Sequence, residues 1–213
     1  MIKGMIFDLD GVIVSTDDCH YLAWKRMADE EGIYFDREIN ERLRGVSRMD
    51  SLQIILERAA KPYTQTEKEA MAARKNDYYV ALIQELTPAD ILPGAAETLA
   101  ALRQKGVKMA IGSSSRNTPV ILERIGLSTA FDAVADGNQI TRSKPDPEVF
   151  LLAARLLGLA PAECLVVEDA DAGVEAALAG GMKALGVGSA AANPSATYRA
   201  KSLAELKLET VLG

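Results

Sequence analysis

Two carboxylates stand close together near the start of the chain, in the run Phe7-Asp8-Leu9-Asp10-Gly11. Residues 2–7 are apolar and rich in branched and aromatic side chains, which predicts a buried strand that ends at Asp8. A carboxylate can attack phosphorus at neutral pH without a base, so Asp8 is predicted to be a nucleophile that becomes an aspartyl-phosphate. Asp10 is then predicted to protonate the leaving oxygen and to deprotonate the acceptor.

Two later segments carry groups suited to holding a phosphate. Ser113 lies in the stretch Gly112-Ser113-Ser114-Ser115, where a hydroxyl and neighbouring backbone N–H groups at the start of a helix can bind phosphate oxygens. Lys144 is followed by Pro145 and Pro147, which stiffen its loop just before another predicted helix. Its ammonium is predicted to offset the charge of Asp8 and of the phosphoryl group.

A second pair of carboxylates, Glu168 and Asp169, follows another apolar run. Carboxylate and carbonyl oxygens are the ligands that Mg²⁺ prefers. In a parallel α/β sheet, polar residues after the strands gather at the edge where ligands bind. The sequence therefore predicts a Mg²⁺ site formed by Glu168 and Asp169 together with Asp8 and the Asp10 carbonyl.

Each of these residues also has an ordinary structural interpretation when it is taken alone. Asp8 and Asp10 are typical turn residues, Ser113 is a typical helix cap, and Lys144 is compatible with a solvated charge. Asp171 is interpreted in this way, as a cap of the helix after Glu168 and Asp169. The combination of all the pieces is what favours chemistry over chance.

The elements that must position these residues alternate along the chain. Further short apolar runs predict strands at residues 107–111, 132–135, 164–167 and 184–187. Helix-period patterns lie between them, at residues 95–104, 118–125, 147–157 and 172–179, and end near Gly106, Gly126, Gly158 and Gly180. This alternation predicts an α/β fold with a Rossmann-like, three-layer core around a parallel sheet.

The stretch from about residue 17 to residue 85 has a different character. It has helix-forming composition, dense charge and no convincing strand, so it is predicted to be an inserted α-helical cap domain. The segments 14–16 and 87–94 are predicted linkers that permit hinge closure. We therefore expect a catalytic core of residues 1–15 and 88–213 and a cap of residues 16–87.

Composition narrows the class of partner. The chain has 213 residues, a formal net charge of -6 and a pI near 5.0, which disfavours nucleic acid and anionic membrane as partners and favours a small molecule. The apolar start is too short for a signal peptide or a membrane span. Cys19 and Cys164 are far apart and fit neither a disulfide framework nor a zinc site, so we expect the protein to act in the reducing cytoplasm. We also expect it to be a monomer.

The four chemical pieces in this order resemble the haloacid dehalogenase superfamily of phosphotransferases, whose motifs are D-x-D, a Ser or Thr, a Lys and an acidic pair. The cap is similar to the β-phosphoglucomutase family at four places, which are Asp18-Cys19-His20, Trp24, Arg44-Gly45-Val46-Ser47-Arg48 and Arg74-Lys75-Asn76-Asp77. This resemblance implies a Mg²⁺-dependent isomerase of carbohydrate metabolism. Such an enzyme interconverts β-D-glucose 1-phosphate and D-glucose 6-phosphate through a phospho-aspartate and β-glucose 1,6-bisphosphate.

The resemblance also assigns roles to matching positions. Asp8 is the nucleophile and Asp10 the general acid/base, and both join Glu168 and Asp169 as metal ligands. The remaining roles fall into three sets: Ser113 and Lys144 bind the transferring phosphate; Gly45, Val46, Arg48, Ser115, Arg116 and Asn117 bind substrate; and Thr16, His20 and Lys75 couple cap closure to the chemistry. Arg44 departs from the family, which frequently has Lys there, and Arg is a planar, bidentate donor.

Three alternatives remain open at this point. A sugar-phosphate phosphatase of the same fold shares every core motif and differs in using water as the acceptor, and the cap residues favour the mutase. A phosphonate hydrolase would need a cap lysine placed to form an imine, which no residue matches convincingly. A non-catalytic phospho-acceptor module would not need Asp10, Lys144 or a sugar-binding cap.

Trp24 is interpreted as packing the cap's own core.

Overall fold

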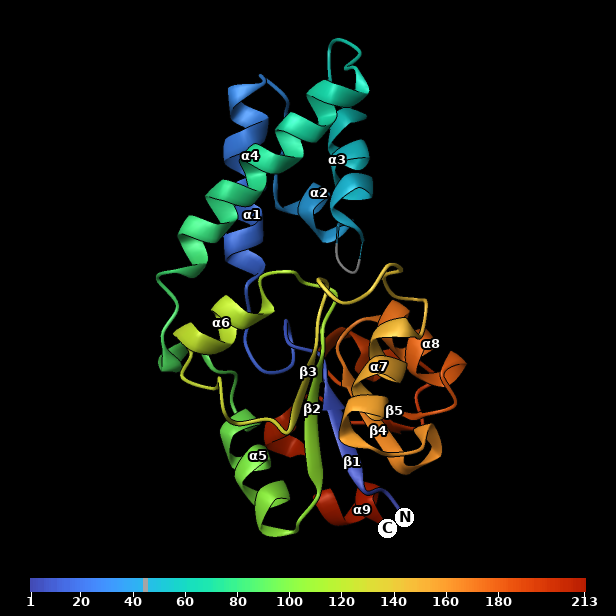
Figure 1. Ribbon diagram of the computed structural model, residues 1–213. Coiled ribbons are helices and arrows are strands. Elements are labelled where there is room, and N and C mark those ends of the chain that lie inside the picture. Colours follow the sequence, from blue (N-terminus) through green and yellow to red (C-terminus); the bar gives the residue numbers. More distant parts are fainter. Residues whose placement is uncertain (44–45) are drawn as a thin grey trace. The chain divides into compact units, whose positions relative to one another are not determined.

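The computed structural model describes residues 1–43 and 46–213, and the chain divides into two compact units (Figure 1). One consists of Met1–Ser15 and Thr87–Gly213, and we call it the α/β unit. The other is Thr16–Leu86, which we call the helical unit. The helical unit is inserted between the first and second strands of the α/β unit.

A parallel sheet forms the centre of the α/β unit, with strands in the order β3-β2-β1-β4-β5-β6. The strands are β1 (Gly4–Phe7), β2 (Lys108–Gly112), β3 (Ala133–Ala135), β4 (Cys164–Glu168), β5 (Lys183–Gly186) and β6 (Tyr198–Arg199). The parallel α/β fold is thus confirmed, and each of the five predicted strands is present. Strand β6 was not predicted, because two residues are too few to produce a periodic pattern.

The register of β1 explains why chemistry is expected at its end. Phe7 pairs with Ile111 of β2 on one side and with Val167 of β4 on the other. The strand order changes direction between β1 and β4, which is the switch point where open α/β sheets bind ligands. Asp8 therefore follows β1 at this point, directly beside Glu168 at the end of β4.

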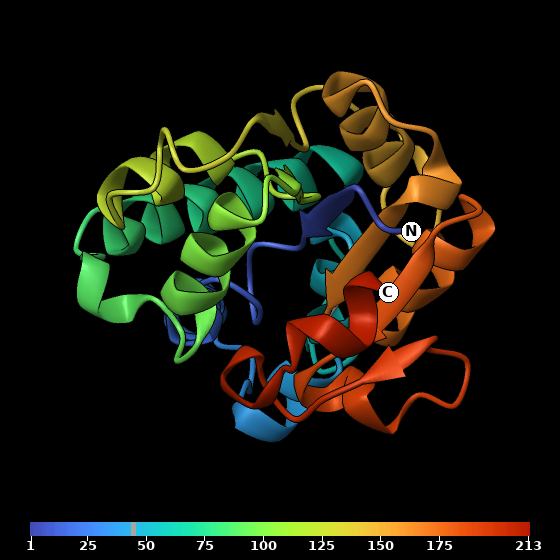
Figure 2. The same ribbon diagram turned by 90° about the horizontal axis from the view of Figure 1, so that it is seen from below.

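Helices cover both faces of the sheet (Figures 1 and 2). They are α5 (Ala95–Gln104), α6 (Thr118–Arg124), α7 (Glu148–Leu157), α8 (Asp171–Ala179) and the short α9 (Leu208–Leu212), which was not predicted. Helices α7 and α8 lie on one face and α5 on the other. Ile6 and Val166 of the sheet pack with Phe150 of α7 and Val174 of α8 in one buried cluster. Strands buried on both faces read as continuous apolar runs, which is why the sequence predicted them.

Two glycines show how these helices end at the predicted positions. Gly158 ends α7 in the left-handed conformation, with φ of 68°, which an L side chain adopts only at a cost. At the end of α8 the left-handed residue is Gly181, with φ of 74°, whereas Gly180 keeps a helical φ of -77°. Helix α8 therefore ends at Ala179, next to Gly180 as predicted, and the left-handed residue follows one position later.

The helical unit is built from α1 (Asp17–Glu30), α2 (Arg37–Glu41), α3 (Arg48–Leu56) and α4 (Gln65–Ile83), and its described residues contain no strand. It has a core of its own, formed by residues such as Trp24, Met27, Leu52, Ile55 and Met71. Trp24 is 3% exposed, so its predicted packing role is confirmed. A unit with its own core can keep its structure independently of the sheet.

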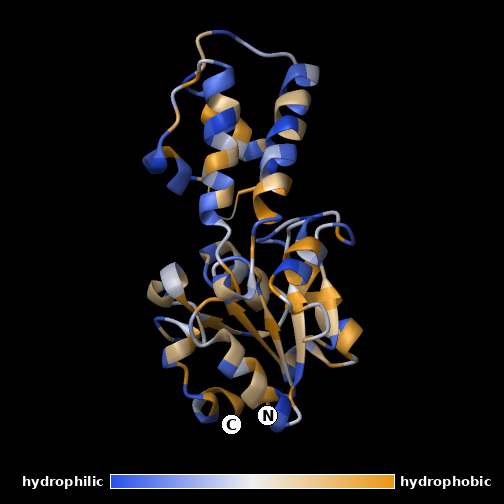
Figure 3. Cartoon of the chain, turned by 90° about the vertical axis from the view of Figure 1, so that its left-hand side faces the viewer, coloured by the Kyte–Doolittle hydropathy of each residue, from blue (hydrophilic) through white to orange (hydrophobic). Residues whose placement is uncertain are grey.

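Hydropathy reflects the two architectures (Figure 3). The central strands are coloured mainly hydrophobic, whereas the helices of the helical unit alternate between hydrophilic and hydrophobic residues. This alternation is typical of helices that bury one stripe against neighbours and leave the other in solvent. Among the described residues, no helix combines the length and apolarity that crossing a membrane requires.

Candidate active site

Asp8 lies where β1 ends and the backbone turns sharply. Its side chain is nearly buried, and its N–H donates to the carbonyl of Val167 at 2.9 Å, which continues the pairing of β1 with β4 by one residue. Gly11 adopts φ of 80°, in the left-handed region that favours glycine, and its N–H donates to the Val14 carbonyl at 2.8 Å. Asp10 lies in the same turn, in an isolated bridge to Val14.

Lys144 is the cation of this site. Its Nζ lies 2.6 Å from Asp8 Oδ1 and 2.5 Å from Glu168 Oε1, and 4.7 Å from the centre of the Phe150 ring. Burial by itself lowers the pKa of Lys144, but the charges of Asp8 and Glu168 outweigh it and hold the pKa above its ordinary value. The side chain is therefore an ammonium, as the sequence predicted, and it contacts the predicted nucleophile directly.

The acidic pair lies deep in the site. Glu168 is 1% exposed, and its Oε2 accepts a hydrogen bond from the Ala170 N–H at 2.9 Å. Burial raises the pKa of Glu168 despite the attraction of Lys144. Burial, followed by repulsion from Asp8 and Glu168, raises the pKa of Asp169 to about 8. One ammonium thus leaves several crowded carboxylates without sufficient compensating charge.

These carboxylates fit a divalent cation. Asp8, Glu168 and Asp169 each offer an oxygen, and the three oxygens lie within 4.8 Å of one another. Two glycines leave room for them: a Cβ on Gly11 would lie 2.2 Å from Asp169 Oδ2, and one on Gly173 would lie 1.9 Å from Glu168 Cδ. Hard oxygen donors that share excess negative charge are typical of Mg²⁺ or Ca²⁺ sites. The cluster does not include the Asp10 carboxylate, and the contribution of the Asp10 carbonyl stays a prediction.

The predicted phosphate loop follows β2 at the same edge of the sheet. Ser113 is 4% exposed, its N–H donates to the Ala135 carbonyl at 3.0 Å, and its Oγ accepts from the Ser115 N–H at 3.2 Å. The Asn117 N–H donates to Ser115 Oγ at 3.2 Å, which holds the loop in a compact turn before α6. Arg116 is exposed, and its guanidinium has no ion pair among the described residues, which leaves it available to an anion.

Gly173 is a functional position that the sequence analysis missed. A glycine in the first turn of α8 costs roughly 1 kcal/mol relative to alanine, and this local penalty was the available signal of a close approach. We expect Gly173→Ala to displace Glu168 and to weaken Mg²⁺ binding about 10- to 100-fold, because groups that orient a ligand have effects of that size. Titration calorimetry with Mg²⁺ measures the affinity of each variant for the ion. The exposed Glu175→Ala change in the same helix is the control, and equal Mg²⁺ affinity in both variants would contradict the expectation.

Asp171 corrects one prediction. Helix α8 begins at this residue, but its cap position is Ala170, which makes no side-chain cap bond. The Asp171 Oδ1 instead accepts a hydrogen bond from Asn193 Nδ2 at 2.8 Å. The prediction that Asp171 caps α8 was therefore wrong by one position, because the sequence does not reveal where the first helical residue falls. The carboxylate still lies in the first turn, where the helix dipole favours it.

In the helical unit, three residues that the resemblance singled out lie together. Thr16 and Lys75 are buried, and Lys75 Nζ lies 2.9 Å from His20 Nδ1. The hydroxyl of Tyr79 donates to Thr16 Oγ1 at 3.1 Å, and its ring stacks on His20 with 4.1 Å between ring centres. Thr16, His20 and Lys75 therefore form one cluster around Tyr79, a residue that the sequence analysis did not single out.

The predicted sugar-binding segment lies at the start of α3. Arg48 is the first residue of this helix, and its Nη2 donates to Asn76 Oδ1 at 2.8 Å. Val46 is partly buried, and its N–H donates to the Leu43 carbonyl at 3.1 Å. Gly45, which was predicted to bind substrate, and Arg44 lie outside the described residues.

The imidazole of His20 is expected to have a pKa below its ordinary value. Burial of the ring, the Lys75 ammonium and the Arg48 guanidinium all lower its pKa from 6.5. The stability that neutral His20 contributes is then complete above pH 6.5 and is lost as the pH falls through the folded-state pKa. His20 is the only histidine, so an NMR titration follows its imidazole without ambiguity. In urea the same signal should titrate near the ordinary value, and a folded-state pKa at or above 6.5 would refute the prediction.

Comparison with known proteins extends these observations. Residues 2–181 match the haloacid dehalogenase-like hydrolase family. Over 210 residues the chain is 44% identical to a β-phosphoglucomutase of Bacillus subtilis. The aligned region covers 98% of this chain and 93% of that protein. It is 29% identical over 215 residues to a phosphorylated carbohydrates phosphatase of Thermotoga maritima, covering 99% of this chain and 97% of that protein.

A solved structure of a β-phosphoglucomutase is also similar to this chain. The crystal structure of a β-phosphoglucomutase from Clostridium difficile matches with a TM-score of 0.90 and 40% sequence identity, over 99% of this chain and 96% of that one. Similarity to mutases therefore extends over both units and exceeds the similarity to the Thermotoga maritima phosphatase.

Proposed function

Because the chain belongs to the haloacid dehalogenase-like hydrolase family, we propose that it interconverts β-D-glucose 1-phosphate and D-glucose 6-phosphate. The observation that carries the proposal is the 44% identity to a β-phosphoglucomutase over 98% of the chain. The phosphatase alternative uses the same core residues but is supported by a more distant relative, at 29% identity. The distinction between the two activities is the acceptor of the phosphoryl group, which is sugar in one and water in the other.

In this reaction an Asp8 oxygen attacks the phosphorus of a phosphorylated donor, the bond from phosphorus to the donor oxygen breaks, and an aspartyl-phosphate forms. Asp10 gives a proton to the departing oxygen and later takes one from the acceptor hydroxyl, whose oxygen forms the new bond to phosphorus. The Lys144 ammonium, 2.6 Å from Asp8, offsets the charge that accumulates on the phosphoryl oxygens. Starting from phospho-Asp8, one cycle passes this phosphoryl group to the C6 hydroxyl of β-D-glucose 1-phosphate and then takes the C1 phosphoryl group of the bisphosphate, so that Asp8 is phosphorylated again when D-glucose 6-phosphate leaves.

The proposal assigns the metal site to Mg²⁺. Asp8, Glu168, Asp169 and the Asp10 carbonyl would hold it, and it would supply positive charge beside the phosphoryl oxygens. The acidic cluster and the two glycines that make room for it support this assignment. The ordinary coordination preference of Mg²⁺ for oxygen ligands is the reason for naming that ion.

The remaining residues are assigned to substrate. Ser113 and Lys144 hold the transferring phosphate, while the guanidinium of Arg116 and the polar groups of Ser115 and Asn117 hold the distal phosphate. Gly45, Val46 and Arg48 contact the substrate, and Thr16, His20 and Lys75 couple movement of the helical unit to the transfer. A monomer that acts in the cytoplasm stays a prediction.

One assay tests the proposal. The purified protein receives β-glucose 1-phosphate, Mg²⁺ and a catalytic amount of β-glucose 1,6-bisphosphate, and glucose 6-phosphate and free phosphate are followed in parallel. We expect glucose 6-phosphate to form far in excess of the bisphosphate, with little free phosphate. Stoichiometric phosphate release would instead establish the phosphatase. The α anomer serves as the matched substrate, and activity in EDTA serves as the control for the metal.

A further inference from the structure

Tyr79 lies at the centre of the cluster formed by Thr16, His20 and Lys75. It is 2% exposed, on the buried side of α4. Thr16 and His20 are four residues apart at the start of α1, and Lys75 and Tyr79 are four residues apart on α4. Side chains with this spacing share one face of a helix, so each helix presents a pair to the other. Tyr79 contacts each of the other three residues of the cluster.

The contact with Thr16 replaces an ordinary helix cap. Thr16 is the N-cap residue of α1, where a threonine hydroxyl commonly accepts a hydrogen bond from a backbone N–H two or three residues later. Thr16 makes no such bond, and its Oγ1 accepts from the Tyr79 hydroxyl at 3.1 Å instead. The Thr16 hydroxyl is therefore oriented by α4.

The contacts with His20 and Lys75 use the Tyr79 ring. The His20 imidazole stacks on it at 26° between ring planes, and Lys75 Nζ lies 4.8 Å from its centre and 4.7 Å from that of Trp24. Lys75 is 3% exposed, and a buried ammonium is costly unless cation–π contacts and hydrogen bonds compensate it. The hydroxyl and the ring of Tyr79 thus orient different members of the cluster.

We propose that Tyr79 is a positioning residue that fixes Thr16, His20 and Lys75 relative to one another. The inference rests on the proposed function, which gives those three residues their role in coupling movement to phosphoryl transfer. Its hydroxyl sets the direction of the Thr16 hydroxyl, and its ring sets the plane of the imidazole that faces the Lys75 ammonium. Phenylalanine would supply the ring alone, so the two contributions can be separated by substitution.

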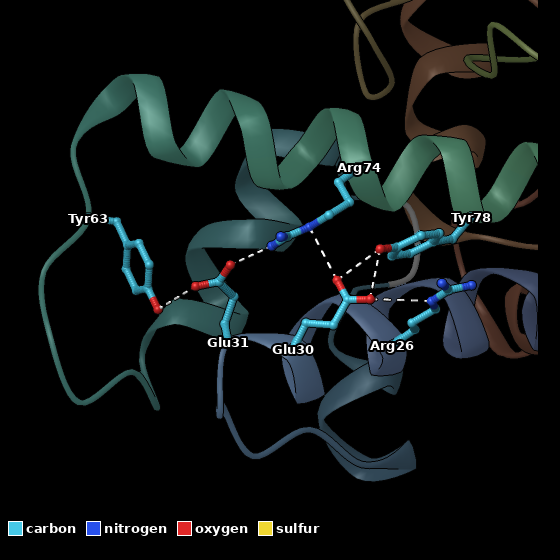
Figure 4. Close-up of polar contacts among 6 residues, drawn as sticks. All are labelled: Arg26, Glu30, Glu31, Tyr63, Arg74 and Tyr78. Atoms are coloured by element: carbon cyan, nitrogen blue, oxygen red, sulfur yellow. Dashed lines mark hydrogen bonds and ion pairs between the residues drawn. The ribbon is translucent and has the colours of Figure 1, made fainter.

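The test compares Tyr79→Phe with Tyr78→Phe. Both changes remove one tyrosine hydroxyl from α4, but the Tyr78 hydroxyl donates to the Glu30 carboxylate, in a network with Arg26 and Arg74 outside the cluster (Figure 4). We expect Tyr79→Phe to lower kcat about 3- to 10-fold with KM changed less than about twofold, as loss of one orienting hydrogen bond predicts. Tyr78→Phe should keep both constants within about twofold of the unsubstituted protein.

A third variant tests the ring. Tyr79→Leu should lower kcat further than Tyr79→Phe, and it should shift the His20 ring-proton NMR signals downfield because the stacked ring current is lost. Circular dichroism and thermal midpoints restrict the comparison to folded variants. Equal kcat values for Tyr79→Phe and Tyr78→Phe, or unshifted His20 signals in a folded Tyr79→Leu, would overturn the inference.

Failure of the proposed function is a separate outcome of the same experiments. If the unsubstituted protein releases phosphate and forms no glucose 6-phosphate, the mutase proposal fails. The Tyr79 variants are then compared with Tyr78→Phe on phosphate release, with the same expected ratio of kcat values and the same His20 signals. A normal mutase reaction with unaffected Tyr79 variants would reject the inference alone.

Discussion

The Asp8→Asn variant should form no phosphoprotein and should lose turnover by about 10⁴- to 10⁶-fold, the range observed when a covalent nucleophile is removed. An amide nitrogen or oxygen is a poor nucleophile toward phosphorus, and the substitution also removes the negative charge that pairs with Lys144 at 2.6 Å. Intact-protein mass spectrometry after incubation with β-glucose 1,6-bisphosphate measures the phosphoryl group directly. Coupled glucose 6-phosphate formation measures the turnover.

Asp10→Asn is the matched variant, because it makes the same change two residues away. It removes the proposed proton transfer while leaving Asp8 and its contact with Lys144 in place, so transfer should slow about 10²- to 10⁴-fold with substrate binding largely retained. A stable phosphoprotein in Asp8→Asn would place the nucleophile elsewhere in the chain. Equal effects of both substitutions on phosphoprotein formation would remove the distinction between nucleophile and acid/base.

The fold was predictable where burial imposes a pattern on the sequence. Strand β1 is buried on both faces, as are the centres of β2 and β4, and each reads as a continuous apolar run. Strand β6 and helix α9 have two and five residues, which is too short for either a two-residue or a 3.6-residue period to appear. The pairing of β6 with β5 comes from tertiary contact and has no local signal.

The site was predictable in its residue types but not in its contacts. Asp8 and Lys144 are separated by 136 positions, and only the topology of a parallel sheet, together with the family resemblance, indicated that they would meet. The need for Gly173 depends on Glu168 approaching to 1.9 Å from where a Cβ would stand, which no helical pattern reveals. The contacts of Tyr79 were not predictable either, because a buried tyrosine on a helix ordinarily indicates core packing.

Lys144→Met should destabilise the metal-free protein by about 3–5 kcal/mol, the usual cost of removing one partner from a buried ion pair. The substitution leaves Asp8 and Glu168 without the ammonium that lies 2.6 Å and 2.5 Å from their oxygens, next to a third carboxylate, Asp169. Without the ammonium the carboxylates carry more uncompensated negative charge, so the variant should bind a divalent cation more tightly than the unsubstituted protein does, and the loss should shrink in Mg²⁺. Urea unfolding in EDTA and in Mg²⁺ measures both values.

The control substitution is Lys105→Met, which removes an exposed ammonium 3.5 Å from Glu209 and should change the free energy of unfolding by less than about 1 kcal/mol in either solution. If Lys144→Met unfolds at the same urea concentration as Lys105→Met in EDTA, the carboxylates do not depend on the ammonium for compensation. A loss that is equally large with and without Mg²⁺ would instead show that the cation binds both proteins equally well and does not replace the missing ammonium. Charge compensation by both Lys144 and the metal requires the large loss in EDTA and the smaller one in Mg²⁺.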